Sequence, residues 1–180
     1  MRNSILGISG SLRASSLNSA LLRAAFDSVG SETDFVIAEI GDLPHYNSDL
    51  DNDYKPAAVS RLIEQVQAAS ALLIVTPEYN YSIPGVLKNA IDWVSRPAYQ
   101  SPLAQKPTGI LGASMSPIGS ARAQSHLRQI LGGTVTPVFP YPDFLVGVAH
   151  TKFDAKGELT DVATREHLAK YVSAFLKWIG

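Results

Sequence analysis

Short apolar segments alternate with longer amphipathic ones along the whole chain. The short segments are rich in strand-forming residues, and they are Ser4–Ser9, Asp34–Ile40, Ala71–Thr76, Thr108–Ala113 and the less regular Thr134–Val148. The longer segments carry apolar residues at every third or fourth position, and they are Asn18–Val29, Ala57–Ala69, Pro84–Val94, Gly119–Leu131 and Asp161–Ile179. This alternation predicts an α/β fold, a doubly wound sheet of five parallel strands with helices on both faces.

Two stretches depart from this pattern. Gly41–Pro56 is longer than the usual ~2–6 residues of a strand-to-helix connection. Its aromatic residues and prolines favour an ordered functional loop over a disordered one. The three prolines of Thr134–Pro142 predict an edge strand or an interrupted strand. Pro84 is expected in the first turn of its helix, where its missing N–H leaves no partner unpaired.

The length and the charge balance exclude several classes of protein. A chain of 180 residues accommodates one domain of the usual ~100–200 residues, so we expect a single domain over residues 1–180. The formal net charge of −1 argues against nucleic acid and against an anionic membrane surface as partners. No segment approaches the ~20 apolar residues of a membrane span, and the apolar run near the N-terminus is too short for a signal peptide. We therefore expect a cytoplasmic location.

The chain contains no cysteine, which excludes a disulfide framework, a thiolate metal site and a cysteine nucleophile. Any redox activity would therefore depend on a bound cofactor. Charged residues make up 17% of the chain, below the ~25% typical of soluble domains. This shortage of charge suggests that subunit contacts cover part of the surface.

Ligands of doubly wound sheets bind at the carboxyl ends of the strands, so the loops after Ser9, Thr76 and Ala113 are the candidate sites. The first loop consists of small hydroxyl residues and Arg13, and a helix follows at once. Free N–H groups at a helix N-terminus, hydroxyl donors and a guanidinium together suit a phosphomonoester. A polar loop that only caps the helix is the alternative. Neither a Walker A loop nor a G-x-G-x-x-G fingerprint is present.

The second loop carries two prolines, which stiffen the segment that presents Glu78, Tyr79, Asn80 and Tyr81. A loop of this kind could hold a flat heteroaromatic ring, or it could be an ordinary turn with packed tyrosines. The third loop begins at Ser114, and its small residues allow a ligand to approach the backbone. We expect the three loops to converge on one crevice.

Other combinations of residues give weaker evidence for a functional site. Asp49, Asp51 and Asp53 imitate a calcium loop, but the required glycine and the bidentate glutamate are replaced by Tyr54 and Ser60. A hydrolase triad of Ser11, His126 and Asp143 lacks the G-x-S-x-G elbow, and His126 falls in a helical segment. Lys88 and Asp92 have the spacing of a helix-face ion pair. Trp93 and Trp178 are expected as core or interface anchors. We assign no metal site.

Two motifs resemble the NADPH-dependent FMN reductase family of flavodoxin-like proteins, in particular its quinone and chromate reductase branch. The first is Gly10-Ser11-Leu12-Arg13-x-x-Ser16-x-Asn18, and the second is Pro77-Glu78-Tyr79-Asn80-x-Ser82-x-Pro84-Gly85-x-Leu87-Lys88-Asn89-Ala90-Ile91-Asp92-Trp93. The resemblance implies a flavodoxin-like fold with noncovalently bound FMN. It implies cofactor-binding roles for Ser11, Arg13, Ser16, Leu17, Asn18 and Ser19 around the phosphate. It places Pro77, Glu78, Tyr79, Asn80, Tyr81 and Ser82 along the isoalloxazine, and Ser114 at the ring or the ribityl chain.

By the same resemblance, we expect an oxidoreductase that passes hydride from NADPH, or from NADH, through FMN to a small-molecule electron acceptor. Quinones, free flavin, azo compounds and metal oxyanions such as chromate are the expected acceptors. Flavin N5 carries this chemistry, and no side chain is assigned as a catalytic acid or base. A homodimer or homotetramer is implied, with the Gly41–Pro56 loop beside a neighbouring subunit's site.

Two other functions stay open from the residues: a flavodoxin-type electron carrier and a non-catalytic FMN-binding module. Electron-carrying flavodoxins are strongly acidic, whereas this chain has a pI of about 6.4. A near-neutral chain lacks the strong negative electrostatic potential with which an electron carrier docks to its partner proteins.

Overall fold

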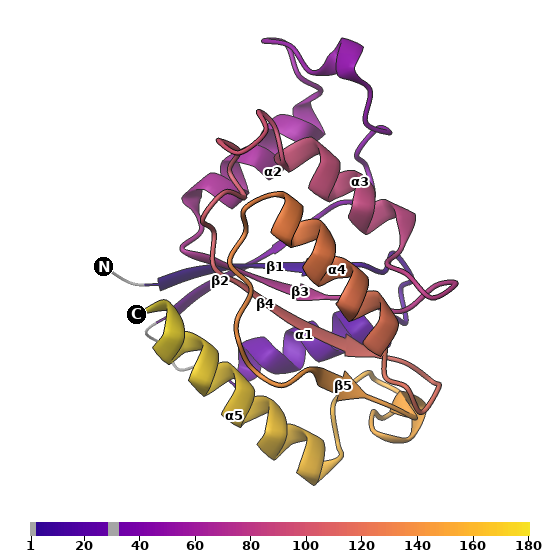
Figure 1. The fold of residues 1–180 in the computed structure, drawn as a ribbon. Coiled ribbons are helices and arrows are strands. Elements are labelled where there is room, and N and C mark those ends of the chain that lie inside the picture. The colour runs from indigo at the N-terminus through magenta and orange to yellow at the C-terminus, as the bar shows by residue number, and fades with distance from the viewer. Residues whose placement is uncertain (1–2, 29–32) are drawn as a thin grey trace.

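A computed structural model describes residues 3–28 and 33–180. Its five strands are β1 (Asn3–Ser9), β2 (Thr33–Ala38), β3 (Ala71–Val75), β4 (Thr108–Ala113) and β5 (Phe144–Val146). They form one parallel sheet in the order β2-β1-β3-β4-β5 (Figure 1). This is the flavodoxin-like strand order, so the fold predicted from the alternation and from the resemblance is confirmed.

Five α-helices cover the two faces of the sheet, and they are α1 (Leu17–Asp27), α2 (Ala57–Ala68), α3 (Gly85–Val94), α4 (Ala121–Gly133) and α5 (Val162–Ile179). Helices α1 and α5 share one hydrophobic core, and α2, α3 and α4 share the other. The strand β3 supplies both cores, because Leu73 and Val75 face the first while Leu72 and Ile74 face the second. A strand buried on both faces is expected for a parallel sheet between two helical layers.

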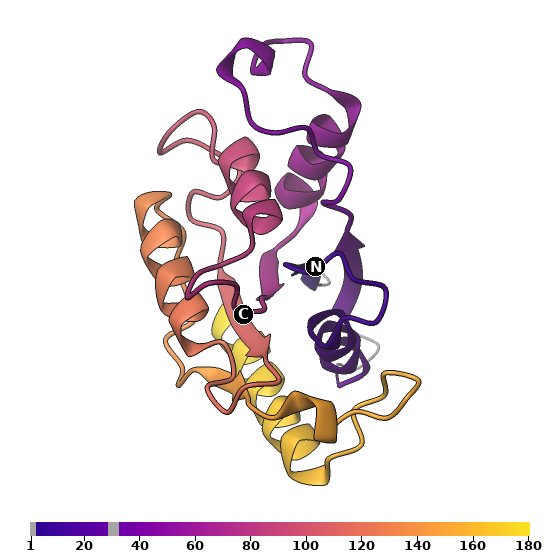
Figure 2. The ribbon, with the colours of Figure 1, turned by 90° about the vertical axis from the view of Figure 1, so that its right-hand side faces the viewer.

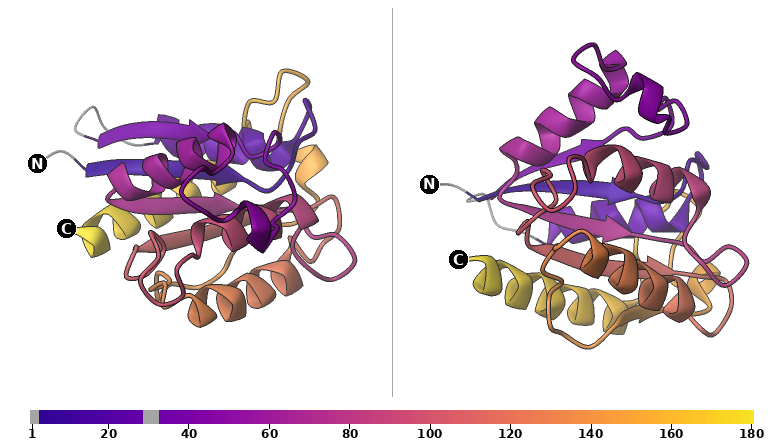
Figure 3. Two further views of the ribbon diagram at one scale, coloured as in Figure 1. Left: turned by 90° about the horizontal axis from the view of Figure 1, so that it is seen from above. Right: turned by 45° about the horizontal axis from the view of Figure 1, so that its top comes forward.

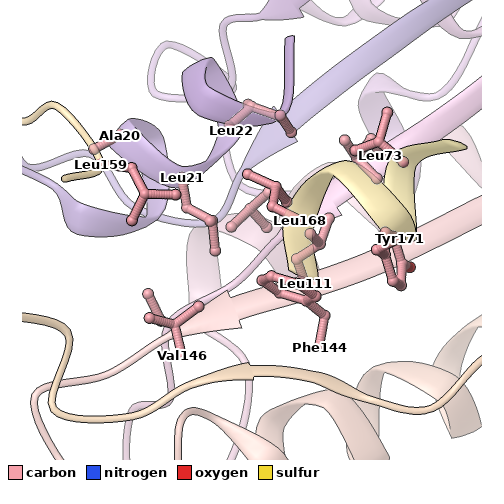
Figure 4. Packing of buried hydrophobic residues seen from close by; sticks show 14 of the residues in the cluster. Ala20, Leu21, Leu22, Leu73, Leu111, Phe144, Val146, Leu159, Leu168 and Tyr171 are labelled. Atoms are coloured by element: carbon pink, nitrogen blue, oxygen red, sulfur yellow. The ribbon is translucent and has the colours of Figure 1, made fainter. Parts of the chain in front are cut away.

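The first core is shown in Figure 4, where side chains of α1 and α5 gather over β3 and β4. Tyr171 of α5 lies in this core and is 2% exposed. Its hydroxyl donates to Ile110 O at 3.0 Å and accepts from Ile110 N at 2.9 Å. The short strand β5 pairs with β4 only from Leu111 onward. The tyrosine hydroxyl therefore pairs with the N–H and C=O groups of Ile110, the β4 residue just before the part of the strand that pairs with β5.

Most of the Thr134–Val148 segment is not strand. Only Phe144–Val146 pairs with β4, at the edge of the sheet, and Val138 makes an isolated bridge to Thr108. The three prolines interrupt the segment, since proline has no N–H to donate to the ladder. The prediction of an edge or interrupted strand is confirmed.

The helix boundaries follow the predicted segments within a few residues, and their ends have local causes. Ser16 caps α1 through Ser19 N at 3.2 Å, and Pro84 occupies the N-cap of α3 instead of its first turn. The helix α4 begins at Ala121 instead of Gly119, because Gly119 and Ser120 adopt left-handed φ values of 63° and 73°. The predicted end of the first helix at Val29 lies outside the described residues.

The Gly41–Pro56 loop is fastened to α3 at its base. Pro44 O accepts from Asn89 Nδ2 at 3.0 Å and from Trp93 Nε1 at 2.8 Å, and Tyr46 N donates to Asn89 Oδ1 at 2.7 Å. Its outer part contains a 3₁₀ turn at Ser48–Leu50 and projects from the body of the molecule, as the purple loop of Figure 2 shows. These contacts agree with the expected ordered loop.

The strand β1 begins and α5 ends on the same side of the sheet, opposite to the carboxyl ends of the strands (Figure 3). Trp93 is fully buried, as expected for a core anchor, and Trp178 is 36% exposed against Phe175. Of the helices in residues 3–28 and 33–180, none is long and apolar enough to cross a membrane.

Candidate functional site

A crevice opens where the loops after β1, β3 and β4 meet, at the carboxyl ends of these strands. Its lining residues are Ser11, Arg13, Ser15, Ser16, Leu17, Asn18, Pro77, Glu78, Tyr79, Ala113, Ser114 and Met115. The convergence of three loops that the sequence predicted is therefore confirmed. The crevice holds about 230 Å³. Typical ligand pockets have ~300–1,000 Å³, and a second hollow of about 270 Å³, which is also lined by Ser11 and Arg13, adjoins this crevice.

The loop from β1 to α1 offers hydrogen-bond donors to this crevice. Gly10 N donates to Val75 O at 2.8 Å, which fixes the base of the loop against β3. A Cβ at Gly10 would lie 3.2 Å from Thr76 Oγ1 and 3.2 Å from the Leu87 side chain, so glycine allows this close approach. The first turn of α1 leaves its N–H groups without partners four residues earlier in the helix, and the helix dipole is positive there.

Arg13 contributes a positive charge to the same loop. Its side chain is exposed, and the guanidinium makes no ion pair with any residue that the structure describes. A free guanidinium beside a helix N-terminus forms a donor set for a phosphate.

Two predicted phosphate ligands have their side chains engaged elsewhere. Asn18 is 5% exposed, and its side-chain amide accepts from Ala113 N at 2.9 Å and donates to Ala113 O at 3.0 Å. It therefore joins α1 to the end of β4, and only its backbone N–H remains for a ligand. The Ser19 hydroxyl lies 2.8 Å from Ser9 Oγ, and Ser19 lines a neighbouring hollow beside residues 37–41 instead of the crevice.

The loop from β3 to α3 divides into a wall and a tip. Pro77, Glu78 and Tyr79 line the crevice, whereas Asn80, Tyr81 and Ser82 are not among its lining residues. Asn80 and Tyr81 adopt left-handed φ values of 49° and 67°. Two backbone hydrogen bonds between Tyr79 and Ser82, of 2.9 and 3.0 Å, close this tight turn. The predicted ring-lining segment is thus only partly at the crevice.

Glu78 is the titratable crevice residue with the most hydrogen bonds. Its side chain is 8% exposed, and its carboxylate accepts from Arg122 N at 3.0 Å, Arg122 Nε at 2.5 Å and Ala123 N at 3.4 Å. Burial alone would raise the pKa of Glu78, but the hydrogen bonds from Arg122 and Ala123 outweigh it and hold the pKa below its ordinary value. Glu78 is therefore ionised at neutral pH and does not serve as a proton donor.

The loop after β4 forms the remaining wall. Ser114 N donates to Val146 O and Ser114 O accepts from Ala149 N, both at 2.9 Å, so the backbone of Ser114 is held in place. Its hydroxyl accepts from Ser116 N at 3.1 Å. Met115 is 64% exposed at the rim.

The crevice also contains residues that sequence reasoning did not select as ligands. Ser15, Ala113 and Met115 line it next to selected residues. Two sequence signals could have identified these residues. Ser15 belongs to the run of hydroxyl residues in the first loop, and Ala113 and Met115 lie at the end of β4 and just after it. The contact of Glu78 with α4 has no such signal, because the partners are 44 residues apart.

The weaker constellations do not form catalytic sites. No group of three or more His, Cys, Asp or Glu side chains that could hold a metal occurs within residues 3–28 and 33–180. His126 lies in α4 with its Nδ1 3.0 Å from Ser82 Oγ, and Asp143 pairs with Arg128 at 2.7 Å. These partners leave no Ser11–His126–Asp143 triad. Lys88 and Asp92 form the expected ion pair at 2.6 Å.

The arrangement combines a donor-rich end with a wall that carries proline, tyrosine and methionine side chains. Arg13 and the N-terminus of α1 suit a phosphate, while Pro77, Tyr79 and Met115 suit a planar ring. Glu78 is ionised and its carboxylate accepts hydrogen bonds from α4, so it supplies no proton to a ligand at neutral pH. Redox chemistry here would belong to a bound cofactor.

Comparison with known proteins gives matches over almost the whole chain. The family model for NADPH-dependent FMN reductase matches residues 3–151. An NAD(P)H-dependent FMN reductase of Pseudomonas aeruginosa is 47% identical over 97% of this chain and 94% of the relative. A quinone reductase of Escherichia coli K12 is 42% identical over 97% of this chain and 94% of the relative. Among solved structures, the flavoenzyme NAD(P)H:(acceptor) oxidoreductase FerB of Paracoccus denitrificans superposes with a TM-score of 0.90, at 38% identity, over 98% of this chain and 97% of that chain.

Proposed function

The chain belongs to the NADPH-dependent FMN reductase family, and from this premise we propose that it passes hydride from NAD(P)H through bound FMN to a quinone. The crevice carries the proposal, because an Arg13 without an ion-pair partner among the described residues and the N-terminus of α1 adjoin a wall that contains Pro77 and Tyr79. The quinone as acceptor is supported by the E. coli relative named quinone reductase. Free flavin, azo compounds and metal oxyanions such as chromate are further small-molecule acceptors within the proposal.

The residues present fit FMN, because the donor set for a phosphate and the wall of Pro77 and Tyr79 lie in one crevice. We assign the phosphate to Arg13, to the hydroxyls of Ser11 and Ser16, and to the backbone N–H groups of Leu17 and Asn18 at the start of α1. We assign the isoalloxazine to the wall formed by Pro77, the backbone of Glu78, Tyr79 and Ser114. Ser19, Asn80, Tyr81 and Ser82 then support these groups from outside the crevice.

When bound, FMN would supply the redox chemistry: it would accept a hydride at N5 and pass that hydride equivalent, with one proton from solvent, to a quinone to give the hydroquinone. Arg13 and the positive end of α1 offset the charge of the phosphate. The prolines of the β3–α3 loop keep the wall rigid, so little conformational entropy is lost when a ring packs against it. Met115 and Tyr79 stand exposed at the mouth, where a flat apolar acceptor would dock.

The test is reduction of the FMN-loaded protein by NADPH and by NADH in the absence of oxygen, followed by turnover with a quinone. We expect NADPH to reduce the flavin, with NADH as the alternative reductant. A protein that binds FMN but is reduced by neither nucleotide would be a non-catalytic FMN-binding module. A protein that is reduced only by a partner protein would be a flavodoxin-type electron carrier.

We also propose that residues 1–180 act as one FMN-binding domain in a cytoplasmic homodimer or homotetramer. In support of the oligomer, the crevice is small and open, and Tyr54 on the projecting Gly41–Pro56 loop is 93% exposed. Tyrosine is enriched at protein–protein interfaces, so this side chain is suited to contact a neighbouring subunit near its crevice. Light scattering coupled to gel filtration measures the subunit number, and a monomer at micromolar concentration would contradict this proposal.

A further inference from the structure

The helix α4 lacks a local cap at its N-terminus. Ser120 occupies the N-cap position in a left-handed conformation, and its side chain makes no capping hydrogen bond among the described residues. Its hydroxyl instead accepts from Gln124 Nε2 at 3.2 Å. The backbone N–H groups of Arg122 and Ala123, in the first turn of the helix, therefore need acceptors from another part of the chain.

Glu78 provides these acceptors from the loop after β3. One carboxylate oxygen accepts from Arg122 N at 3.0 Å and from Ala123 N at 3.4 Å, and the other accepts from Arg122 Nε at 2.5 Å. A second guanidinium nitrogen of Arg122 completes the ion pair. The carboxylate thus joins the wall of the crevice to the helix that follows the next strand.

The same helix also holds the tip of the loop. The guanidinium of Arg122 lies over the ring of Tyr81, 3.8 Å from its centroid, and Ser82 Oγ lies 3.0 Å from His126 Nδ1. Asn80 and Tyr81 have left-handed backbones, a conformation that asparagine tolerates and tyrosine rarely adopts. The backbone hydrogen bonds between Tyr79 and Ser82 close a two-residue turn that requires these conformations, and the contacts with α4 hold that turn in place.

We propose that Glu78 is a positioning residue, whose carboxylate fixes the Pro77–Ser82 loop on α4 in the shape that receives the isoalloxazine. The inference rests on the proposed binding of FMN in this crevice. Both oxygens of Glu78 are already occupied by α4, so its carboxylate acts through the backbone of the loop and not by contact with the ring. Loss of the carboxylate also leaves the charge of Arg122 without its counter-ion.

The test compares Glu78→Gln and Glu78→Ala with a matched control, Asp161→Asn. Asp161 is also a carboxylate that caps a helix, since it accepts from Thr164 N at 2.9 Å at the start of α5, and it also pairs with a cation, Lys152, at 3.4 Å. It is not among the residues that line the crevice. All variants should lose some thermal stability, and the comparison separates this general loss from a local effect on the loop.

Two measurements distinguish the positions. Hydrogen–deuterium exchange of the apo-protein should accelerate in the peptides covering 77–84 and 118–124 for the Glu78 variants, and should stay unchanged there for Asp161→Asn. Titration of FMN by fluorescence quenching should show affinity weakened about tenfold or more by Glu78→Gln, because a loop released from α4 must be ordered when FMN binds. Asp161→Asn should bind FMN within about twofold of the unmodified protein, because measured effects below that factor are within ordinary surface variation.

The outcomes are separable. If the unmodified protein does not bind FMN, the proposed function fails, whatever the variants do. If it binds FMN and Glu78→Gln binds equally well with unchanged exchange of the loop, the positioning role is refuted and the proposed function stands. If Glu78→Ala does not fold, Glu78→Gln, which keeps one acceptor oxygen for the helix, decides the question.

Discussion

Replacement of Arg13 by alanine should weaken FMN binding without destabilising the protein. The exposed guanidinium makes no ion pair with any described residue, so its removal takes no intramolecular contact away. What is lost is the charge-assisted bond to the phosphate, about 1.5–3 kcal/mol. A loss of that size raises the Kd for FMN by about 10- to 150-fold.

The assay is fluorescence titration of the apo-protein with FMN, alongside thermal unfolding without FMN. Arg13→Lys should lie between the unmodified protein and Arg13→Ala, since lysine keeps the charge but not the planar fork. Arg23→Ala is the control, because Arg23 is an exposed arginine of α1 that lines a hollow beside Gly157 instead of the crevice. An unchanged Kd for Arg13→Ala would show that Arg13 is a solvated loop residue and would refute the assignment of the phosphate.

Three further predictions concern the framework of the site. Tyr171→Phe leaves two backbone groups of β4 unpaired and should lower the free energy of unfolding by about 2–4 kcal/mol in denaturant titrations. The control is Tyr141→Phe, because the Tyr141 hydroxyl has no hydrogen bond within the described chain, and this change should lower the free energy of unfolding by less than about 0.5 kcal/mol. The pKa of Glu78 lies below its ordinary value of 4.5, so its contribution to stability is complete above that pH and is lost as the pH falls through the lowered pKa. Melting curves between about pH 5 and pH 2 should therefore show a steeper loss for the unmodified protein than for Glu78→Gln; parallel curves would contradict the ionised carboxylate. Asn18→Ala removes both bonds to Ala113 and should destabilise the apo-protein by about 2–4 kcal/mol, and unfolding with an unchanged midpoint would show that this tie is not structural.

The sequence was sufficient for the sheet because each strand and helix carries its own periodic pattern. The apolar run Ala71–Thr76 indicated a strand buried on both faces, and β3 is that strand. Such local patterns, together with the handedness of crossover connections, leave few alternatives for the strand order. The place of the site followed from the same rule, since the carboxyl ends of parallel strands share one edge.

The sequence did not predict which groups the individual polar side chains form hydrogen bonds with. Asn18 stood where a phosphate ligand was expected, but its amide is paired with a backbone 95 residues away. The left-handed tip has only a partial local signal, because asparagine favours this conformation at position 80 but tyrosine does not favour it at position 81. These choices depend on which buried donors and acceptors lie nearby after folding, and local propensity does not carry that information.

The tertiary contacts around the crevice have a common consequence for ligand binding. Asn18 joins the first loop to β4, Glu78 joins the second loop to α4, and Ser114 is held between Val146 and Ala149. Each of these bonds is made within the chain, so the three walls take their shape before any ligand arrives. A preformed crevice loses little conformational entropy on binding, which is one route to tight noncovalent binding with few direct contacts.

The exposed Arg13 is the exception, because its side chain gains its partner only when a phosphate is present. Affinity should therefore depend on two separable terms, the order of the walls and the charge of one guanidinium. The double variant Glu78→Gln, Arg13→Ala should show nearly additive losses in the free energy of FMN binding.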